Sequence, residues 1–377
     1  MLENRSHCLL IAGTYDGYIV GLEIKNNQEL QQNNIPNLYL HPIFAFKAHS
    51  SSIRDISANE HFLLTASSDE TMRIYNLITR CDSGILTKHQ GNINKIILSP
   101  KSKYMISCGE DKLICLWNCI NWQPLLELSK IHKFNPISVD FHPSMRLALS
   151  IDQYGTICLI DLIKGCCSLT TTAHILGPNI PNTTHKSKYG FINRINFNQD
   201  GYLYAIISQF NIIVYSLIES DKCVNLFVIP SKLTITAFSW ISNNFIIVGF
   251  SDGSIKFFYV TLNEFLEIKI IFNYSKFENN IPNLHRIKGV IPIYIAENIV
   301  YNGFLGICDS NGLFILFSYI IDQDYPHFIL NLKCYDSYNF DTRITCLCTS
   351  SNYLNIIYEN KKKKIKNKNI KKKIKKD

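Results

Sequence analysis

The sequence predicts an all-β fold in which seven four-stranded sheets close into a ring, and three observations support this prediction. Hydrophobic residues make up 46% of the 377 residues, with 22 Phe and 20 Tyr, and aromatic and β-branched side chains favour strands. A strand-rich unit recurs along the chain, and its endings Tyr75, Trp117 and Ile160 lie 42 and 43 residues apart. The unit at the N-terminus lacks one strand, and a strand-like segment near the C-terminus lacks partners.

Each unit begins near a histidine, continues through alternating strands, and ends with a polar turn and a further strand. A third copy begins at His132, and three weaker copies follow within 191–317. The polar and aromatic positions of the two complete copies are His49, Thr65, Asp69 and Tyr75 in the first, and His89, Ser107, Asp111 and Trp117 in the second.

The seventh unit is divided between the two ends of the chain. Residues 9–47 supply three strands but no innermost one, whereas 343–349 alternates properly and stands alone. We predict that 343–349 completes the N-terminal sheet, because closure removes the exposed strand edges of an open array. The predicted domains are therefore a ring over 1–358 and a lysine-rich tail over 359–377.

The formal charge of +8 comes from this tail, which holds eleven lysines between Lys361 and Lys376. The body has 27 basic and 29 acidic residues, which argues against a basic nucleic-acid-binding face. We predict a disordered tail that directs nuclear import or contacts RNA. A merely solvated end is the alternative, and membrane-surface attraction is disfavoured. The lysines assigned to this role are Lys361, Lys362, Lys363, Lys364, Lys371, Lys372, Lys373, Lys375 and Lys376.

Chemistry-bearing motifs are missing from the sequence. There is no phosphate-binding loop, no HExxH, no GxSxG and no CxxC among the thirteen cysteines, so we expect no enzyme, cofactor or metal site. The segment Leu233–Phe250 carries no charge, but Asn243 and Asn244 divide it into two strand-length pieces. We therefore predict two strands here and no membrane span.

Three connections are longer than a four-stranded unit requires, namely 25–40, 170–189 and 262–288, and we predict surface loops there. Tyr154 stands where the third unit should have its turn Asp, and the fifth unit also lacks one. These units are expected to rely on apolar packing. The side chains of Arg54, Arg73, Lys95 and Arg194 are expected at loop tips, where they could line a binding face, although solvated charges are the favoured interpretation.

Period, histidine, turn Asp and final aromatic residue together resemble WD40 repeats. This resemblance implies a seven-bladed WD40 β-propeller with N/C-terminal strand closure and a disordered basic tail. In WD40 repeats the His–Ser/Thr–Asp–aromatic set is a buried hydrogen-bond relay. A catalytic His–Asp pair is the alternative, but an active site is needed once whereas a structural brace is needed in each blade.

Within 48–165 the chain resembles the Mak/PAK-interacting-protein family of nucleolar WD-repeat proteins. The less generic matches are Asp69-Glu70-Thr71 before Ile74-Tyr75, and His142-Pro143-Ser144 with Leu147-Ala148-Leu149-Ser150. The resemblance implies a non-enzymatic scaffold for large (60S) ribosomal subunit biogenesis and pre-rRNA processing in the nucleolus, a compartment of the nucleus. Its implied partners are ribosome assembly factors or ribosomal-protein-like proteins, with pre-rRNA contact through the tail.

The same family is linked in animals to inhibition of PAK-type protein kinases. A WD40 regulator that binds and inhibits such a kinase is therefore the alternative function. Neither hypothesis involves a membrane or a small-molecule substrate.

Overall fold

The fold is described by a computed structural model in which 28 strands form seven sheets. The described residues are 8–26, 38–99, 103–172, 192–217, 223–228, 233–260, 268–274, 283–294, 302–321 and 330–350.

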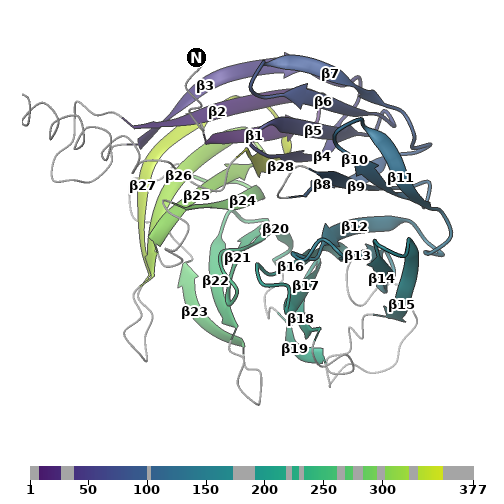
Figure 1. Cartoon of the computed structure of the whole chain (residues 1–377). Coiled ribbons are helices and arrows are strands. Elements are labelled where there is room, and N and C mark those ends of the chain that lie inside the picture. The colour runs from purple at the N-terminus through teal and green to yellow at the C-terminus, as the bar shows by residue number, and fades with distance from the viewer. Residues whose placement is uncertain are drawn as a thin grey trace, which may run out of the picture.

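Each sheet has four antiparallel strands, which we call a, b, c and d from the ring axis outward (Figure 1). In the order a to d, the blades are β28 (Ile344–Thr349), β1 (Leu9–Thr14), β2 (Tyr18–Asn26) and β3 (Leu38–Lys47); β4 (Ile53–Ala58), β5 (Phe62–Ser67), β6 (Met72–Asn76) and β7 (Cys81–Leu86); β8 (Ile93–Leu98), β9 (Tyr104–Gly109), β10 (Ile114–Asn118) and β11 (Gln123–Leu128); β12 (Pro136–Phe141), β13 (Leu147–Asp152), β14 (Thr156–Asp161) and β15 (Cys166–Thr172); β16 (Ile192–Phe197), β17 (Leu203–Ser208), β18 (Asn211–Ser216) and β19 (Cys223–Val228); β20 (Ile235–Trp240), β21 (Phe245–Phe250), β22 (Ile255–Val260) and β23 (Ile268–Tyr274); β24 (Ile287–Tyr294), β25 (Asn302–Asp309), β26 (Leu313–Ile321) and β27 (Leu330–Asn339).

The predicted all-β, seven-bladed propeller is confirmed. Blades pack face to face, so the middle strands are apolar on both sides, as in β1 and β21, where all six residues are buried. The outermost strands β7 and β11 alternate instead between exposed and half-buried residues. The hydrophobic pattern of a strand therefore indicates whether it lies in the middle of its blade or at the outer edge.

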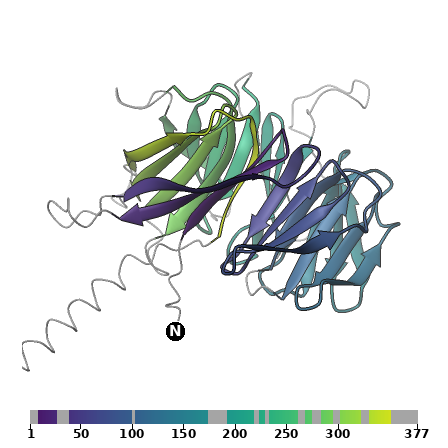
Figure 2. The same cartoon turned by 90° about the horizontal axis from the view of Figure 1, so that it is seen from above.

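The predicted closure of the ring is also confirmed. Strand β28 pairs antiparallel with β1, with Ile11 opposite Cys348 and Gly13 opposite Cys346. The Leu9 amide donates to the Ser350 hydroxyl at 3.1 Å, and the Ser350 amide donates to the Leu9 carbonyl at the same distance. Seen from above, the yellow C-terminal strands lie beside the purple N-terminal ones (Figure 2).

Two predicted loops are shorter than expected. Strand β23 lies inside the predicted loop 262–288. Strand β2 ends at Asn26 and strand β3 begins at Leu38, so both enter the predicted loop 25–40. Segment 170–189 holds the end of β15, and its remainder lies outside the described residues. Asn- and Pro-rich neighbours obscured these strand ends in the sequence.

The uncharged segment Leu233–Phe250 forms β20 and β21, as predicted. Among the described residues, no helix is long and apolar enough to cross a membrane. The boundary predicted at 358/359, and the tail lysines beyond it, lie outside the described residues.

Candidate functional site

The second complete unit brings its four polar and aromatic residues into one chain of hydrogen bonds. The Trp117 indole Nε1 donates to Ser107 Oγ at 3.0 Å, and Ser107 Oγ lies 2.9 Å from His89 Nε2. His89 Nδ1 lies 2.9 Å from Asp111 Oδ2. Since a carboxylate only accepts, the proton of His89 is assigned to Nδ1, and Nε2 accepts from the Ser107 hydroxyl.

The first complete unit repeats this geometry with one difference. His49 Nε2 lies 2.7 Å from Thr65 Oγ1, and His49 Nδ1 lies 3.0 Å from Asp69 Oδ2. Tyr75 packs edge-on against Phe46, with ring centroids 5.2 Å apart. The structure therefore places Tyr75 beside the chain of hydrogen bonds, whereas the indole of Trp117 is part of it.

Electrostatics favour the neutral-histidine, ionised-carboxylate form of this unit. Burial lowers the pKa of His49, and the nearby Asp69 only partly opposes it. Burial tends to raise the pKa of Asp69, but hydrogen bonds from Thr71 and the adjacent His49 outweigh it and bring the pKa below 3.8. The carboxylate thus remains an acceptor across the physiological pH range.

A third such set occurs where the sequence predicted none. His132 Nε2 lies 2.7 Å from Ser150 Oγ, whereas His132 Nδ1 lies 3.7 Å from Asp152 Oδ2, which is beyond hydrogen-bond range, so this set is looser than the other two. Asp152 Oδ1 accepts the amides of Tyr154 and Thr156, each at 2.9 Å. The expectation that this blade lacks a turn Asp was therefore wrong.

The sequence reasoning missed Asp152 because it follows Ser150 by two residues, whereas Asp111 follows Ser107 by four. A signal was present nonetheless, since His132 and Ser150 are 18 residues apart, as are His89 and Ser107. Asp309 serves its own turn in the same way, accepting the amides of Asn311 and Leu313.

The buried thiols are poorly suited to nucleophilic chemistry. Burial raises the pKa of Cys115, Cys119 and Cys346 to about 12, so the thiolate is scarce at neutral pH. No cluster of three or more potential metal ligands occurs among the described residues.

The four charges assigned to loop tips lie on strands instead. Lys95 is paired with Asp55 at 2.9 Å, and Arg194 faces a pocket on the ring axis. Arg54 and Arg73 lie on β4 and β6 and approach Glu110 and Asp82 at 3.8 and 3.4 Å. The predicted loop-tip position was therefore wrong for all four residues, and the favoured interpretation as a solvated charge was wrong for Lys95 and Arg194.

One face of the ring carries the loops that enter the blades (d–a) and the b–c turns, and it presents exposed aromatic side chains. Phe134 and Tyr154, 41% and 51% exposed, lie in contact with ring centroids 4.1 Å apart and ring planes tilted by 57°. On another blade the Arg343 guanidinium lies 4.5 Å from the ring of Tyr15, which is 51% exposed. Each pair joins a d–a loop to a b–c turn, so we call this the d–a face.

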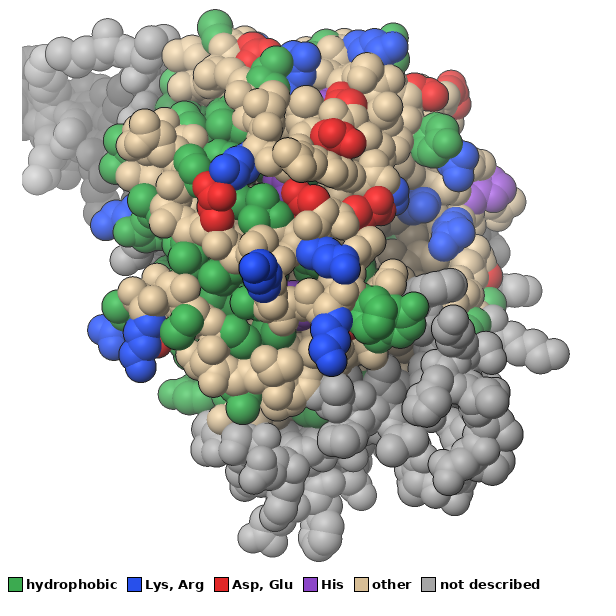
Figure 3. Space-filling model, turned by 90° about the vertical axis from the view of Figure 1, so that its right-hand side faces the viewer, with side chains coloured by type: hydrophobic (Ala, Val, Ile, Leu, Met, Phe, Trp, Pro, Cys, Tyr) green, Lys and Arg blue, Asp and Glu red, His purple; other side chains and the backbone are tan. Residues whose placement is uncertain are grey.

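Charge is mixed on the surface outside such sites. The side of the molecule shown in Figure 3 carries Lys and Arg intermixed with Asp and Glu, with hydrophobic side chains between them. This mixture agrees with the nearly neutral composition of the body.

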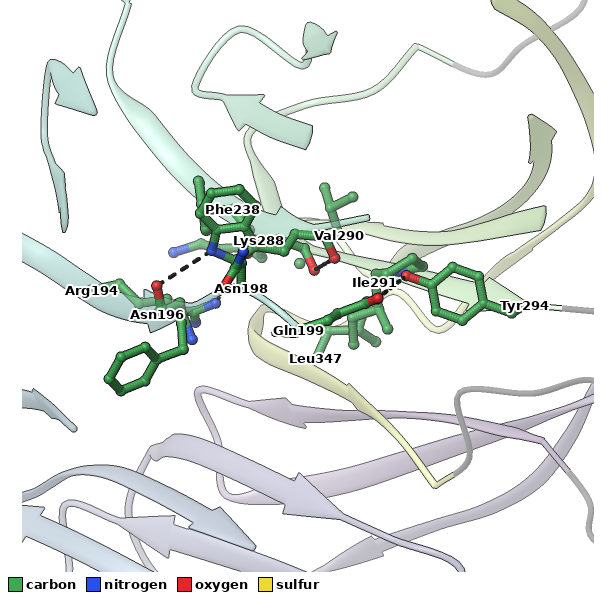
Figure 4. A pocket seen from close by; sticks show the side chains of 15 residues that line it. Arg194, Asn196, Asn198, Gln199, Phe238, Lys288, Val290, Ile291, Tyr294 and Leu347 are labelled. Carbon is green, nitrogen blue, oxygen red and sulfur yellow. Dashed lines mark hydrogen bonds between the residues drawn. The ribbon is translucent and has the colours of Figure 1, made fainter. Parts of the chain in front are cut away.

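A pocket of about 300 Å³ lies at the ring axis between strands β16, β20, β24 and β28 (Figure 4). Its charged lining residues are Arg194 and Lys288, and Asn196, Asn198 and Gln199 add amide groups. The remaining lining is largely apolar and comprises Phe197, Phe238, Trp240, Gly289, Val290, Ile291, Pro292, Tyr294 and Leu347, with Ser239.

Comparison with known proteins agrees with this geometry. The family model described as "WD domain, G-beta repeat" matches residues 40–76 and 81–118. With seven closed blades and recurring His–Asp sets, the chain is a WD40-repeat β-propeller.

Its relatives narrow the class further. It is 25% identical over 350 residues to "p21-activated protein kinase-interacting protein 1-like" of Danio rerio, covering 91% of this chain and 80% of that protein. It is 25% identical to human "p21-activated protein kinase-interacting protein 1", covering 90% and 76% of the two chains. It is 32% identical to "Protein MAK11" of Saccharomyces cerevisiae over 40% of each chain. The chain is thus a homologue of PAK-interacting protein 1-like proteins and yeast MAK11.

Proposed function

We propose that this protein is a non-enzymatic, protein-binding scaffold for large (60S) ribosomal subunit assembly and pre-rRNA processing in the nucleolus. The observation that carries the protein-binding part is the d–a face, where the exposed Phe134–Tyr154 and Arg343–Tyr15 pairs stand on d–a loops and b–c turns. The loop of Phe134 is held by the buried His132–Ser150 hydrogen bond. Rigid, exposed aromatic and arginine side chains are typical anchors of protein interfaces. The ribosomal part rests on the resemblance within 48–165 and on the similarity to MAK11.

The His–Ser/Thr–Asp sets act as structural braces in this proposal. Ser107 and Thr65 are fully buried, and His49 and His89 are 2% and 3% exposed. A serine in a hydrolytic site must meet its substrate, whereas these side chains meet only one another. The sets join the d–a loop to the b–c turn, and this connection keeps the binding face rigid.

The lysine-rich tail at 359–377 would direct the scaffold to the nucleolus. Eleven like charges suit nuclear import and a salt-sensitive contact with pre-rRNA. Removing 361–377 should spread a fluorescently tagged protein into the cytoplasm and reduce its recovery with pre-ribosomal RNA. An unchanged nucleolar distribution would contradict this role of the tail.

The scaffold proposal is tested by purifying tagged full-length protein and identifying what accompanies it. We expect ribosome assembly factors, and we expect the protein to co-sediment with large-subunit precursors. A double variant Phe134→Ala/Tyr154→Ala should reduce recovery of the direct partner by about tenfold or more. The matched control is Ile120→Ala/Ile163→Ala, which removes two exposed hydrophobic side chains from c–d turns at the opposite ends of the strands.

A kinase-binding regulator is the second candidate, and the printed names of the animal relatives favour it. The fission yeast "Shk1 kinase-binding protein 15", 22% identical over 157 residues, points the same way. A regulator of this kind should bind and inhibit a purified PAK-type kinase and should retain its location without the tail. Recovery of such a kinase without any large-subunit precursor would replace the first proposal by the second.

A further inference from the structure

Arg194 and Lys288 line the axial pocket, yet neither has a carboxylate within 4 Å among the described residues. The contact given for Arg194 is a donation from Nη1 to the Phe238 carbonyl at 3.4 Å. Figure 4 shows both residues in the lining of the pocket, one from β16 and the other from β24. Both side chains are half-buried.

Lys95 occupies the position equivalent to Arg194 in another blade, and it has the acidic partner that Arg194 lacks within the described part of the chain. Lys95 follows the bulge of β8 as Arg194 follows the bulge of β16. Asp55 of the preceding inner strand β4 binds Lys95 Nζ at 2.9 Å and also accepts the Ile96 amide at 3.0 Å. In the strand before β16, the residue at that place is Ser138, which interacts with the Ile195 amide at 3.2 Å but carries no charge.

Lys288 is surrounded by further positive charge. Burial lowers its pKa first, and the guanidinium groups of Arg286 and Arg343 lower it further. Arg286 immediately precedes β24 and Arg343 precedes β28, so both stand on the d–a face where Lys288 begins its strand. Four cations thus stand at or near the d–a mouth of the pocket, and none of them forms an ion pair with an acid within the described residues, although Asp309 lies in register with Ile287. A half-buried cation is costly unless an anion balances it.

The rest of the pocket indicates what kind of anion would fit. Ile291 and Leu347, which are half-buried, present apolar surface in the pocket with the two cations, and the buried side chains of Val290 and Phe238 lie behind them in its lining. A volume of about 300 Å³ suits one or two side chains and is too small for a folded element. A nucleic-acid backbone would bring its phosphates but little to cover the apolar wall.

We propose that the d–a mouth of the axial pocket binds an acidic–apolar peptide segment of a protein partner, with its carboxylate on Arg194 and Lys288 and its apolar side chain on Ile291 and Leu347. Arg286 and Arg343 would attract the segment before contact. This inference rests on the protein-binding function proposed above and adds the site and the chemistry of its ligand.

The test uses full-length protein and an array of short immobilised peptides in which Asp and Glu alternate with Leu or Phe. Each peptide has a counterpart with Asn and Gln in place of the acids. Wild-type protein should be retained by acidic members and not by their amide counterparts. Arg194→Gln/Lys288→Gln should reduce this retention by about tenfold or more.

The control variant is Lys103→Gln, which removes an exposed lysine from the a–b turn at the opposite end of β8. It should bind like wild type. The melting temperature of Arg194→Gln/Lys288→Gln should be unchanged or higher, because two uncompensated cations are removed, so that loss of binding does not reflect unfolding.

The inference would be overturned if no acidic peptide retained the wild-type protein, or if the double variant were retained equally well. It would also be overturned if oligouridylate at equal concentration displaced the peptide, because this would indicate a phosphate-binding site. The two proposals fail separately. If the double variant purifies with the same partners as wild type, the axial site is refuted and the scaffold stands. If wild type purifies with no protein partner, the scaffold itself is refuted.

Discussion

Hydrogen bonds link Ser107 to His89 and His89 to Asp111, as in a hydrolytic triad, but the burial of these residues is that of a structural network. The Trp117 indole already donates to Ser107 Oγ, and Ser107 is fully buried. The same set recurs around His49, and a looser one without the His–Asp hydrogen bond occurs around His132. At the scale of single residues, these sets should therefore be measurable as stability and not as activity.

Asp111→Ala tests this directly. The substitution leaves three donors without an acceptor, namely His89 Nδ1 and the amides of Gln90 and Leu113. We expect the free energy of unfolding to fall by about 2–4 kcal/mol in urea titrations. The neighbouring exposed Glu110→Ala should change it by less than about 0.5 kcal/mol. Equal stability of the two variants would contradict the brace.

Asp140 gives a pH dependence of defined sign. Its carboxylate accepts the Phe197 amide at 2.8 Å, and burial raises its pKa to about 6 from 3.8. Because the folded state binds this proton more tightly than the unfolded state, the contribution to stability grows as pH falls through 6.

Relative to Asp140→Asn, wild type should therefore gain about 1 kcal/mol of unfolding free energy between pH 7 and pH 5. Urea titrations of both proteins at the two pH values measure this difference, and subtracting the variant removes the effect of histidines such as His49. A difference that is constant with pH, or that shrinks on acidification, would refute the assignment.

Residues of the braces could be read from the sequence where spacing is regular, as for His89, Ser107 and Asp111. Asp152 could not, because its turn places the carboxylate at another position in the chain. The axial pocket was unpredictable for a different reason. Arg194 and Lys288 belong to strands about ninety residues apart, and only the ring brings them to one pocket.

At the scale of elements, the inner strands are tied to one another by side chains that accept backbone amides of the next blade. Asp55 accepts the Ile96 amide, and the Leu98 amide donates to Ser57 Oγ at 3.0 Å. Strand β12 is joined to β16 by two equivalent hydrogen bonds, in which Ser138 and Asp140 accept backbone amides of β16. Adjacent blades are therefore joined by polar contacts at the axis and by apolar packing farther out.

The Asp55–Lys95 pair lets this coupling be measured. Its side chains are 7% and 14% exposed, so Asp55→Ala strands a buried cation and should cost about 3–5 kcal/mol of unfolding free energy. Adding Lys95→Met should recover more than half of this loss, because the unpaired charge disappears. Additive losses in the double variant, measured by urea titration, would show that the pair is not coupled.

Strands were predictable where a short, largely apolar run precedes a polar turn, as in β5, β9 and β21. Strand β23 was missed because outermost strands have one packed side and a weaker pattern, and its neighbours are Asn- and Pro-rich. Asp16 and Gly17 lie in the turn between β1 and β2. Gly17 has φ of 80°, and its carbonyl accepts the amides of Ala48 and His49 on the next blade.

At the scale of the whole molecule, β28 closes the ring and joins two blades. The Thr345 hydroxyl contacts the carbonyls of Gly13 and Ile53 at 3.0 and 2.6 Å, one in its own sheet and one in the next blade. The incomplete N-terminal unit and the orphan strand at 343–349 predicted this closure from the sequence. The binding partner and cellular role of the protein had no comparable signal within the sequence, and the hypotheses about them came only from the resemblance to known families.

Truncation separates the closing strand from the tail. A chain ending at Ser350 should unfold like the full-length protein in urea. A chain ending at Phe340 loses the buried side chains of Ile344, Cys346 and Cys348 and exposes the edge of β1. We expect it to lose at least about 3 kcal/mol or to fail to fold. Equal stability of the two truncated chains would argue against closure.

The most direct measurement of ring closure is a cross-link between the two ends of the chain. Cys8 Sγ lies 3.5 Å from Thr349 Oγ1, so Thr349→Cys places two thiols at bonding range. Refolding this variant in a glutathione redox buffer, followed by peptide mass spectrometry, should give a disulfide between residues 8 and 349 that Thr345→Cys, at the other end of β28, does not form. A folded Thr349→Cys protein in which both thiols stay free, or pair elsewhere, would contradict the closed propeller.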